Sequence, residues 1–186
     1  MSNFEFVFSL FGLLLGLALA EVLGGFGNAL EARRKVRIGW LTPLLGLVVA
    51  LDLTSFWTVA WTVRDVIPAG YISLLYGFVL TGIYYLVARI VFPRDPAEWP
   101  DYDLYYFAHK RVVLGGVLLC NVLASAGQWA LGNALFSPGD WFSMGLFYPP
   151  LALAIWAPGK RANLALLVIL MLYYPMLALS GLLYGR

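Results

Sequence analysis

Cysteine and histidine are almost absent from the chain, which contains one of each, Cys120 and His109. A single cysteine cannot form an intramolecular disulfide or a cysteine metal cage. A single histidine excludes a bis-histidine haem site and a two-histidine zinc site within the chain. The sequence therefore predicts no metal site, and it identifies no cofactor. No motif in it is diagnostic of a protein family.

Charged residues are scarce as well, at 12% of the chain, while 62% of the residues are hydrophobic. Soluble domains carry about 25% charged residues, so this composition excludes an ordinary soluble domain. The formal net charge is only +2, and the basic residues cluster between apolar runs, so we expect no nucleic-acid partner. The partner that this composition predicts is the lipid bilayer.

Six apolar runs divide the chain. They cover residues 6–28, 40–63, 69–91, 112–133, 141–157 and 162–184. Each has roughly the 20 residues that a helix needs to cross a hydrocarbon core about 30 Å thick. Spanning strands are shorter, at about ten residues, and alternate in polarity, which these continuous runs do not. We therefore predict an all-α integral membrane protein, with a single transmembrane domain over residues 1–186 built as a bundle of six transmembrane helices.

Basic residues predict the orientation of these helices. Ten of the twelve lysines and arginines lie around the segments that follow the first, third and fifth runs: Arg33, Arg34, Lys35, Arg37, Arg89, Arg94, Lys110, Arg111, Lys160 and Arg161. Basic loops stay in the cytoplasm, so we expect both termini on the extracytoplasmic side. Because the sequence has almost no extramembrane mass, a bacterial inner membrane is the default location.

Residues 11–20 followed by Glu21 also resemble the core and cleavage site of a secretory signal peptide. Two features oppose cleavage, since the first residues carry no positive charge and the apolar run continues beyond Ala20. Cleavage would also place the basic cluster that follows outside the cytoplasm. We therefore interpret residues 6–28 as an uncleaved span. The basic cluster is expected to contact anionic lipids, and it consists of Arg33, Arg34, Lys35 and Arg37.

The only long connection, residues 93–111, begins with a proline-rich stretch that opposes a helix. From Asp101 or Asp103 onward, an N-cap residue, several aromatics and a basic end predict a short interfacial helix that leads into the fourth span. One interpretation of this segment is a metal or catalytic cluster formed by Glu98, Asp101, Asp103 and His109. We favour the simpler interpretation, in which these residues are helix caps and members of a solvated loop.

A weak internal similarity relates the two halves of the chain. The sequence GNAL occurs at 27–30 and again at 132–135, and GWLTPLL at 39–45 resembles GLFYPPL at 145–151. Two three-helix halves of opposite topology would form an inverted repeat, as in many transporters. Short matches among apolar residues also arise by chance, and the third and sixth spans do not align, so the repeat is the weaker hypothesis.

The first span carries a carboxylate, Glu21, in an otherwise apolar run. Small side chains repeat every fourth residue beside it, forming a ridge of Gly12, Gly16, Ala20, Gly24 and Asn28. Such ridges let another helix approach closely, so we predict that the first span is a central helix packed against protein on this face. Because a charge in hydrocarbon costs at least about 2.5 kcal/mol, Glu21 needs a partner, a proton or water.

Polar residues on other spans fall at a similar depth. At about 1.5 Å per residue, Glu21 lies roughly 10–14 Å and Asp52 roughly 18 Å from the cytoplasmic ends of their spans. An asparagine interrupts the fourth span, and prolines that free backbone carbonyls interrupt the fifth and sixth. We predict that these groups line one polar cavity, a ligand or ion pathway formed by Glu21, Asp52, Asn121, Pro149, Pro150, Tyr173 and Tyr174.

Three classes of function remain open, in this order. The first is a transporter or channel for a cation, a proton-coupled solute or a similar small ligand, in which the mid-membrane carboxylates bind the cation or proton. The second is a scaffold or accessory subunit of a larger membrane complex, favoured by the lack of a soluble domain in this sequence and by its many small-residue and aromatic surfaces. The protein partners that stay open are subunits of such a complex or further copies of the chain in a homo-oligomer. The third is an intramembrane lipid-modifying enzyme that uses the segment 98–109. With no nucleophile motif and no metal-ligand set, an enzyme is the less favoured outcome.

Overall fold

The described residues form six α-helices and one short 3₁₀-helix. The computed structural model describes residues 2–132 and 138–184. In chain order the elements are α1 (Asn3–Ala32), α2 (Leu41–Thr62), α3 (Tyr71–Ile90), the 3₁₀-helix η1 (Pro96–Glu98), α4 (Tyr102–Ala130), α5 (Pro138–Trp156) and α6 (Lys160–Tyr184). The all-α prediction is confirmed, and each predicted span corresponds to one α-helix.

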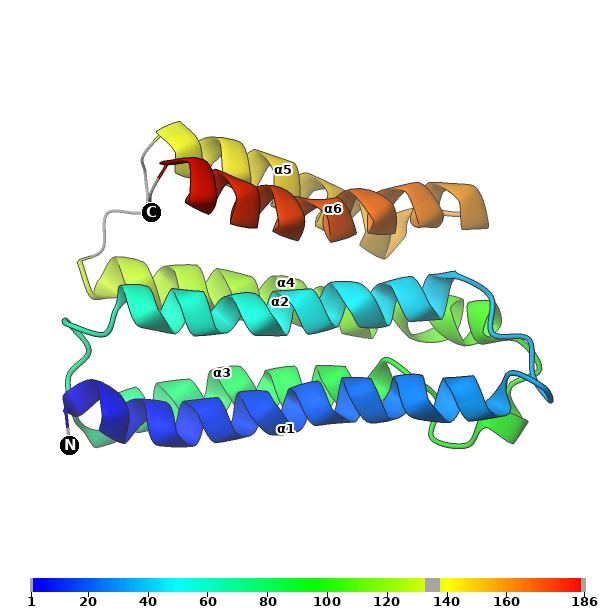
Figure 1. Ribbon diagram of the computed structural model, residues 1–186, viewed down its shortest axis with the longest axis horizontal. Helices are drawn as coiled ribbons and strands as arrows, with labels where there is room; N and C mark the ends of the chain where they lie inside the picture. Colours follow the sequence, from blue (N-terminus) through cyan, green and yellow to red (C-terminus); the bar gives the residue numbers. More distant parts are fainter. Residues whose placement is uncertain (1, 133–137, 185–186) are drawn as a thin grey trace.

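The helices pack as three layers of two (Figure 1): α1 beside α3, α2 beside α4, and α5 beside α6. The middle layer contacts both of the others. On one side α1 packs on α2 and α3 packs on α4, and on the other side α6 packs on α2 and α5 packs on α4. Buried apolar side chains form a continuous core through these interfaces, including Leu53 of α2, Val87 of α3 and Leu114 of α4. The middle of the α2–α4 layer is therefore the best-shielded part of the bundle.

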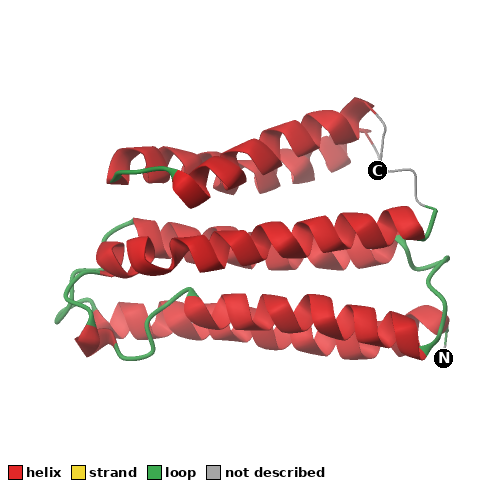
Figure 2. Cartoon of the chain, turned by 180° about the vertical axis from the view of Figure 1, so that it is seen from behind, coloured by secondary structure: helices red, strands yellow, loops and turns green. Residues whose placement is uncertain are grey.

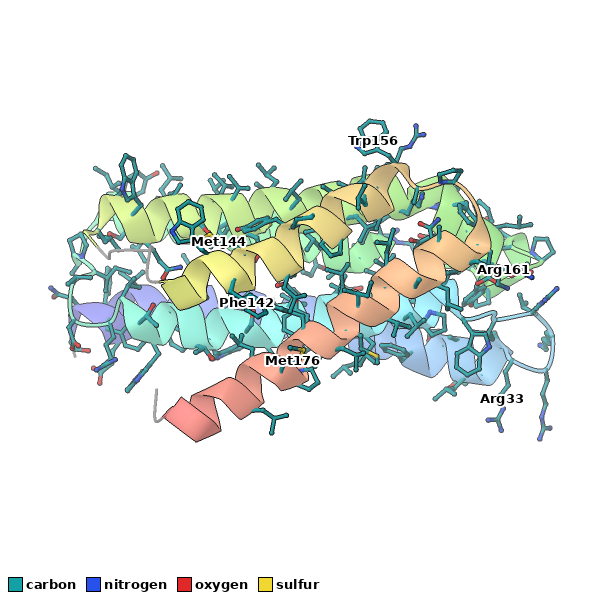
Figure 3. All side chains as sticks on the ribbon, turned by 90° about the horizontal axis from the view of Figure 1, so that it is seen from above. Arg33, Phe142, Met144, Trp156, Arg161 and Met176 are labelled. Carbon is teal, nitrogen blue, oxygen red and sulfur yellow. The ribbon has the colours of Figure 1, made fainter. Side chains whose placement is uncertain are left out.

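The connections alternate between the two ends of the bundle, as Figure 2 shows from behind. The links α1–α2, α3–α4 and α5–α6 lie at one end, which we call the basic end. The start of α1 and the end of α6 lie at the other. Arg33 and Arg161, from two of the basic segments, are both found at the basic end (Figure 3). That this end faces the cytoplasm stays a prediction.

Five of the described helices, α1, α2, α3, α4 and α6, are long and apolar enough to cross a membrane. The sixth, α5, contains a shorter apolar stretch, Trp141–Trp156. Large apolar side chains are also exposed on the outside of the bundle, among them Leu13, Ile72 and Phe142. Lipid accommodates such a surface, whereas water does not. The chain is therefore a helical multi-pass membrane protein.

Glycines set how closely the helices approach one another. A Cβ on Gly25 of α1 would lie 2.3 Å from the Phe92 ring, and one on Gly46 of α2 would lie 2.7 Å from the same ring. The Phe92 ring is therefore inserted between α1 and α2. In the same way, a Cβ on Gly116 of α4 would lie 2.2 Å from Val87 Cγ2 of α3. These glycines leave room for a side chain of a neighbouring element.

The middle of the small-residue ridge of α1, at Gly16, Ala20 and Gly24, does not pack tightly against another described helix, contrary to the prediction. A Cβ on Gly16 or Gly24 would meet nothing within 4 Å, and Ala20 between them is exposed. Helix α1 lies in an outer layer and buries a different face, which includes Leu15, Ala18 and Val22. A repeat of small residues is compatible both with close helix packing and with an open surface, so the pattern alone could not decide between them.

The predicted interfacial helix is the first part of α4 rather than a separate element. Helix α4 runs without a break over 29 residues, because no proline follows Pro100 until the helix has ended. Asp101 is its N-cap, and the Asp101 carboxylate accepts a hydrogen bond from the backbone N–H of Asp103 at 2.7 Å. The expectation that acidic residues of this segment cap a helix is confirmed for Asp101.

The inverted repeat stays a hypothesis. Most of its second GNAL match, residues 133–135, lies outside the described residues. Helix α1 packs closely along α3, but the corresponding pair of the second half, α4 and α6, has no close backbone packing within residues 2–132 and 138–184. The helix arrangement therefore adds no support to the repeat.

Candidate functional site

Asp52 lies in the middle of α2 with only 1% of its surface exposed. Two side chains donate hydrogen bonds to its Oδ2, the Tyr84 hydroxyl of α3 and the Asn121 amide of α4, the latter at 2.9 Å. The Tyr174 hydroxyl of α6 donates to Oδ1 at 2.8 Å. We call these residues the Asp52 cluster. Its members come from all three layers, so one carboxylate connects the layers through polar contacts.

The three partners of the Asp52 carboxylate are all neutral. Among the described residues, no lysine, arginine or histidine forms an ion pair with it. The donated hydrogen bonds satisfy an ionised carboxylate, but they leave its charge without a counter-ion in a low-dielectric interior, which is costly. A bound proton removes that charge. The arrangement is therefore chemically suited to take up and release a proton.

Apolar side chains enclose the Asp52 cluster. The Phe56 ring, one turn further along α2, packs edge-on against the Tyr84 ring with their centroids 5.2 Å apart. Cys120 precedes Asn121 in α4, is fully buried and places its thiol 3.7 Å from the Leu80 carbonyl oxygen. Cys120 is thus a free cysteine packed in the core, next to the cluster but not bonded to the carboxylate.

Glu21 belongs to a different cluster, between α1 and α3. Its Oε1 accepts hydrogen bonds from the Arg89 guanidinium at 2.7 Å and from the Tyr85 hydroxyl at 3.1 Å. The Glu21 and Arg89 side chains keep 34% and 36% of their surface exposed. Both line a cavity of about 320 Å³ between the two helices, which we call the α1–α3 groove. Its other lining residues include Leu17, Ala20, Gly24, Asn28, Pro93 and Arg94.

The structure does not bring Glu21 and Asp52 into one cavity. Tyr84 and Tyr85 are consecutive in α3, and consecutive helix residues point about 100° apart, so one reaches Asp52 and the other reaches Glu21. The partner of Glu21, Arg89, is one residue from the end of α3.

Of the other residues predicted for the pathway, Asn121 and Tyr174 join Asp52. Tyr173 instead pairs with the Ser143 hydroxyl of α5 at 2.7 Å. Pro149 and Pro150 lie inside α5, and no described side chain of that helix hydrogen-bonds to the Asp52 carboxylate. The predicted set therefore separates into the Asp52 cluster, the α1–α3 groove, the Tyr173–Ser143 contact between α6 and α5, and the two prolines inside α5.

Asp103 has a structural role at the basic end. Its Oδ1 accepts hydrogen bonds from the backbone N–H groups of Trp40 at 3.2 Å and Leu41 at 3.0 Å, at the start of α2, and its other oxygen pairs with Lys160. Gly39 has a positive φ of 64°, and a Cβ there would lie 2.3 Å from the carboxylate. Asp103 thus joins α4 to the first turn of α2.

The remaining residues of the predicted loop cluster have separate partners. His109 Nδ1 lies 3.0 Å from the Tyr105 carbonyl oxygen, and the two rings stack with centroids 4.1 Å apart. Asp101 caps α4 and forms an ion pair with Arg37 at 3.6 Å, and Glu98 is exposed. In the part of the chain that the structure describes, no three His, Cys, Asp or Glu side chains form a group that could hold a metal ion.

The basic cluster at the end of α1 is exposed, as its predicted role requires. Its members, Arg33, Arg34, Lys35 and Arg37, follow the last residues of α1. Their contact with anionic lipids stays a prediction.

A buried lysine was missed by the sequence analysis. Lys110 of α4 is 5% exposed and donates to the backbone carbonyls of Ala154 at 3.0 Å and Ala157 at 2.6 Å, where α5 ends. It also donates to Asn163 Oδ1 of α6 at 2.8 Å, which accepts from the Tyr106 hydroxyl at 2.9 Å as well. A cation is favourable at a helix C-terminus because it complements the helix dipole. The feature that could have identified Lys110 as buried was its position on the face of α4 that packs against the core.

Comparison with protein-family models, with curated proteins and with solved structures finds no match to this chain. The class that the fold and the cluster define is a helical multi-pass membrane protein with a buried carboxylate shared among its layers. Its function has to be argued from that carboxylate.

Proposed function

We propose that this chain is a proton-coupled transporter and that Asp52 binds the coupling proton. The observation that carries the proposal is a buried carboxylate in the middle of a spanning helix, held by neutral donors from α3, α4 and α6. Ionisable residues inside membrane helices are costly, and they commonly mark ion and proton pathways for that reason. The transported solute is a small ligand or cation.

Proton binding changes the hydrogen bonds that Asp52 accepts. The ionised carboxylate accepts one bond each from Tyr84, Asn121 and Tyr174. The protonated carboxyl donates its own proton to one neighbour, and it is a weaker acceptor for the others because the charge is gone. The polar connection between the layers is then weaker. A proton-dependent change of packing between helix layers is a suitable basis for alternating access.

The helix best placed to move when Asp52 binds a proton is α6. Pro175, directly after Tyr174, lacks the N–H that would bond to the Met171 carbonyl. From Met176 to Leu179 the side chains are exposed, and Figure 3 shows Met176 on the half of α6 that leads away from the other helices. The Tyr174–Asp52 bond thus lies where the packed half of α6 gives way to the less packed half.

Transient currents on solid-supported membranes test this proposal without knowledge of the solute. Wild-type protein in proteoliposomes is expected to give a transient current after a pH jump, and Asp52→Asn is expected to give none. The matched control is Asp65→Asn, because Asp65 is 80% exposed in the link between α2 and α3. Circular dichroism and size-exclusion profiles check that the variants fold. If Asp52→Asn gives the same transient current as the wild type, the proposal is wrong.

We also propose a bacterial inner membrane as the location, with the basic end in the cytoplasm. The support is the concentration of lysine and arginine in the segments at that end. Cysteines introduced at Ser2 and at Arg34 test the orientation with a membrane-impermeant maleimide on intact cells. Ser2→Cys is expected to react and Arg34→Cys is not, and the native Cys120 gives little background because it is buried. The reverse pattern overturns the orientation.

A second candidate function is a membrane-embedded scaffold or accessory subunit of a larger membrane complex. The observation that favours it is the presence of exposed apolar side chains in α6 after Pro175, where Met176 is 51% and Leu179 is 57% exposed. Purification in a mild detergent tests it. A stoichiometric partner protein supports this second function, and a monomer or a homo-oligomer without other proteins counts against it.

A further inference from the structure

The α1–α3 groove contains charged side chains that the proposed transport step does not use. Two cations, Arg89 and Arg94, and one anion, Glu21, line the groove, so the formal charge of these three is +1. Glu21 holds the Arg89 guanidinium through Nη1. A guanidinium has five N–H donors, so this ion pair leaves donors for a second anion. From this we infer that the groove binds the phosphate of an anionic phospholipid, independently of transport at Asp52.

The position of the groove fits a lipid headgroup. Arg89 is one residue from the end of α3, and Arg94 lies in the link that follows. Lipid headgroups of one leaflet lie at this level, where spanning helices end. Basic pockets between transmembrane helices are known to hold anionic headgroups. A phosphodiester carries one negative charge and therefore balances the excess positive charge of the groove.

On the α1 side of the groove, the lining side chains change from polar to apolar toward the middle of the bundle. Asn28 lies on the side of the basic end, and Glu21 lies two turns deeper along α1. One further turn along is Leu17, which is 47% exposed. A ligand with a charged head and an apolar tail matches this order of side chains. Free phosphate matches only the first part of it.

Glycine at position 24 of α1 leaves space for a ligand in the groove. The cavity measures about 320 Å³, and a Cβ on Gly24, which lines it, would meet nothing within 4 Å. A Cβ on Gly16 would also meet nothing within 4 Å, but Gly16 does not line the groove. Leucine at position 24 is therefore expected to fill the groove without a clash in the fold. Leucine at position 16 is a matched control on the same helix.

Native mass spectrometry of the detergent-purified full chain tests the proposal, with phosphatidylglycerol and phosphatidylcholine as the added lipids. Wild-type protein is expected to retain phosphatidylglycerol about tenfold more tightly than phosphatidylcholine, as one charge-assisted contact predicts. Gly24→Leu and Arg94→Gln are expected to reduce that retention by about tenfold. Gly16→Leu is expected to bind as the wild type does. Circular dichroism confirms that the three variants fold.

Four results overturn the proposal. Equal retention of the two lipids would show that the groove does not prefer an anionic headgroup. An equal loss of phosphatidylglycerol retention in Gly16→Leu and Gly24→Leu would show that the groove is not the binding site. Displacement of phosphatidylglycerol by millimolar inorganic phosphate identifies a site for soluble phosphate instead. A wild-type dimer that Gly24→Leu dissociates identifies a second copy of the chain as the occupant.

Discussion

The hydrogen bond between Tyr174 and Asp52 can be measured by itself. Replacing Tyr174 by phenylalanine removes the hydroxyl that donates to Asp52 Oδ1 at 2.8 Å and keeps the ring, which packs against Phe147. Combined with Asp52→Ala in a double-mutant cycle, it isolates the coupling free energy of the pair. We expect this coupling to depend on whether Asp52 carries its proton.

The two protonation states predict different magnitudes. Hydrogen bonds between neutral side chains of membrane helices average about 0.6 kcal/mol and reach at most about 1.7 kcal/mol. Hydrogen bonds to ionised groups contribute about 1.5–3 kcal/mol. Tyr174 is one of three donors to the carboxylate, so we expect a coupling of about 2 kcal/mol with Asp52 ionised and about 0.6 kcal/mol with it protonated. The coupling should therefore fall as the pH is lowered.

Unfolding in mixed micelles of increasing SDS content, followed by tryptophan fluorescence, gives the free energies for the cycle at high and low pH. Tyr173→Phe is the matched control, because the Tyr173 hydroxyl pairs with Ser143 at 2.7 Å, so its coupling to Asp52 is expected to be near zero. A coupling of Tyr174 below about 0.3 kcal/mol at both pH values would refute the bond, since that is within the ordinary error of additivity. A large coupling that does not change with pH would refute the reasoning from charge.

Two further predictions concern packing and capping. Gly116→Ala places a Cβ 2.2 Å from a Val87 methyl, so we expect it to lower the free energy of unfolding by about 1–3 kcal/mol. Gly115→Ala places a Cβ with nothing within 4 Å, so we expect it to leave the free energy of unfolding unchanged or to raise it slightly. Unfolding of both variants in SDS checks this. Asp103→Ala removes the acceptor at the start of α2 and the partner of Lys160, and we expect a loss of about 1–3 kcal/mol. Asp65→Ala, at an exposed ion pair, is expected to change stability by less than about 0.5 kcal/mol in the same assay.

The Asp52 cluster was largely predictable from the sequence. Depth counting placed Asp52, Asn121 and Tyr174 at one level, and the structure joins all three. The method worked because α2, α4 and α6 all begin at the basic end, so the depths of these residues were counted from one side. Tyr84 was not predicted, since tyrosine is common in apolar spans and the pair at 84–85 does not reveal which ring faces the core. That choice depends on how α3 is rotated against α2, which is a tertiary property.

The surroundings of Glu21 were not predictable in the same way. Its partner Arg89 is distant in the sequence and was counted among the basic residues that determine orientation. Helical periodicity identifies a shared face, but it does not say which helix covers that face. The ridge of small residues therefore suggested a helix contact where the structure has a groove. Similarly, Lys110 was assigned to a basic loop because the continuity of α4 was not foreseen.

The counter-ions decide which carboxylate is the better proton site. Glu21 faces the guanidinium of Arg89, so its negative charge is balanced without a proton. Asp52 has only neutral donors around it, so a proton is the means of removing its charge within the described fold. Glu21→Gln is therefore expected to keep the transient current after a pH jump, in the same proteoliposomes in which Asp52→Asn loses it. Loss of the current in Glu21→Gln, with its helical content intact, would mean that proton binding is not confined to Asp52.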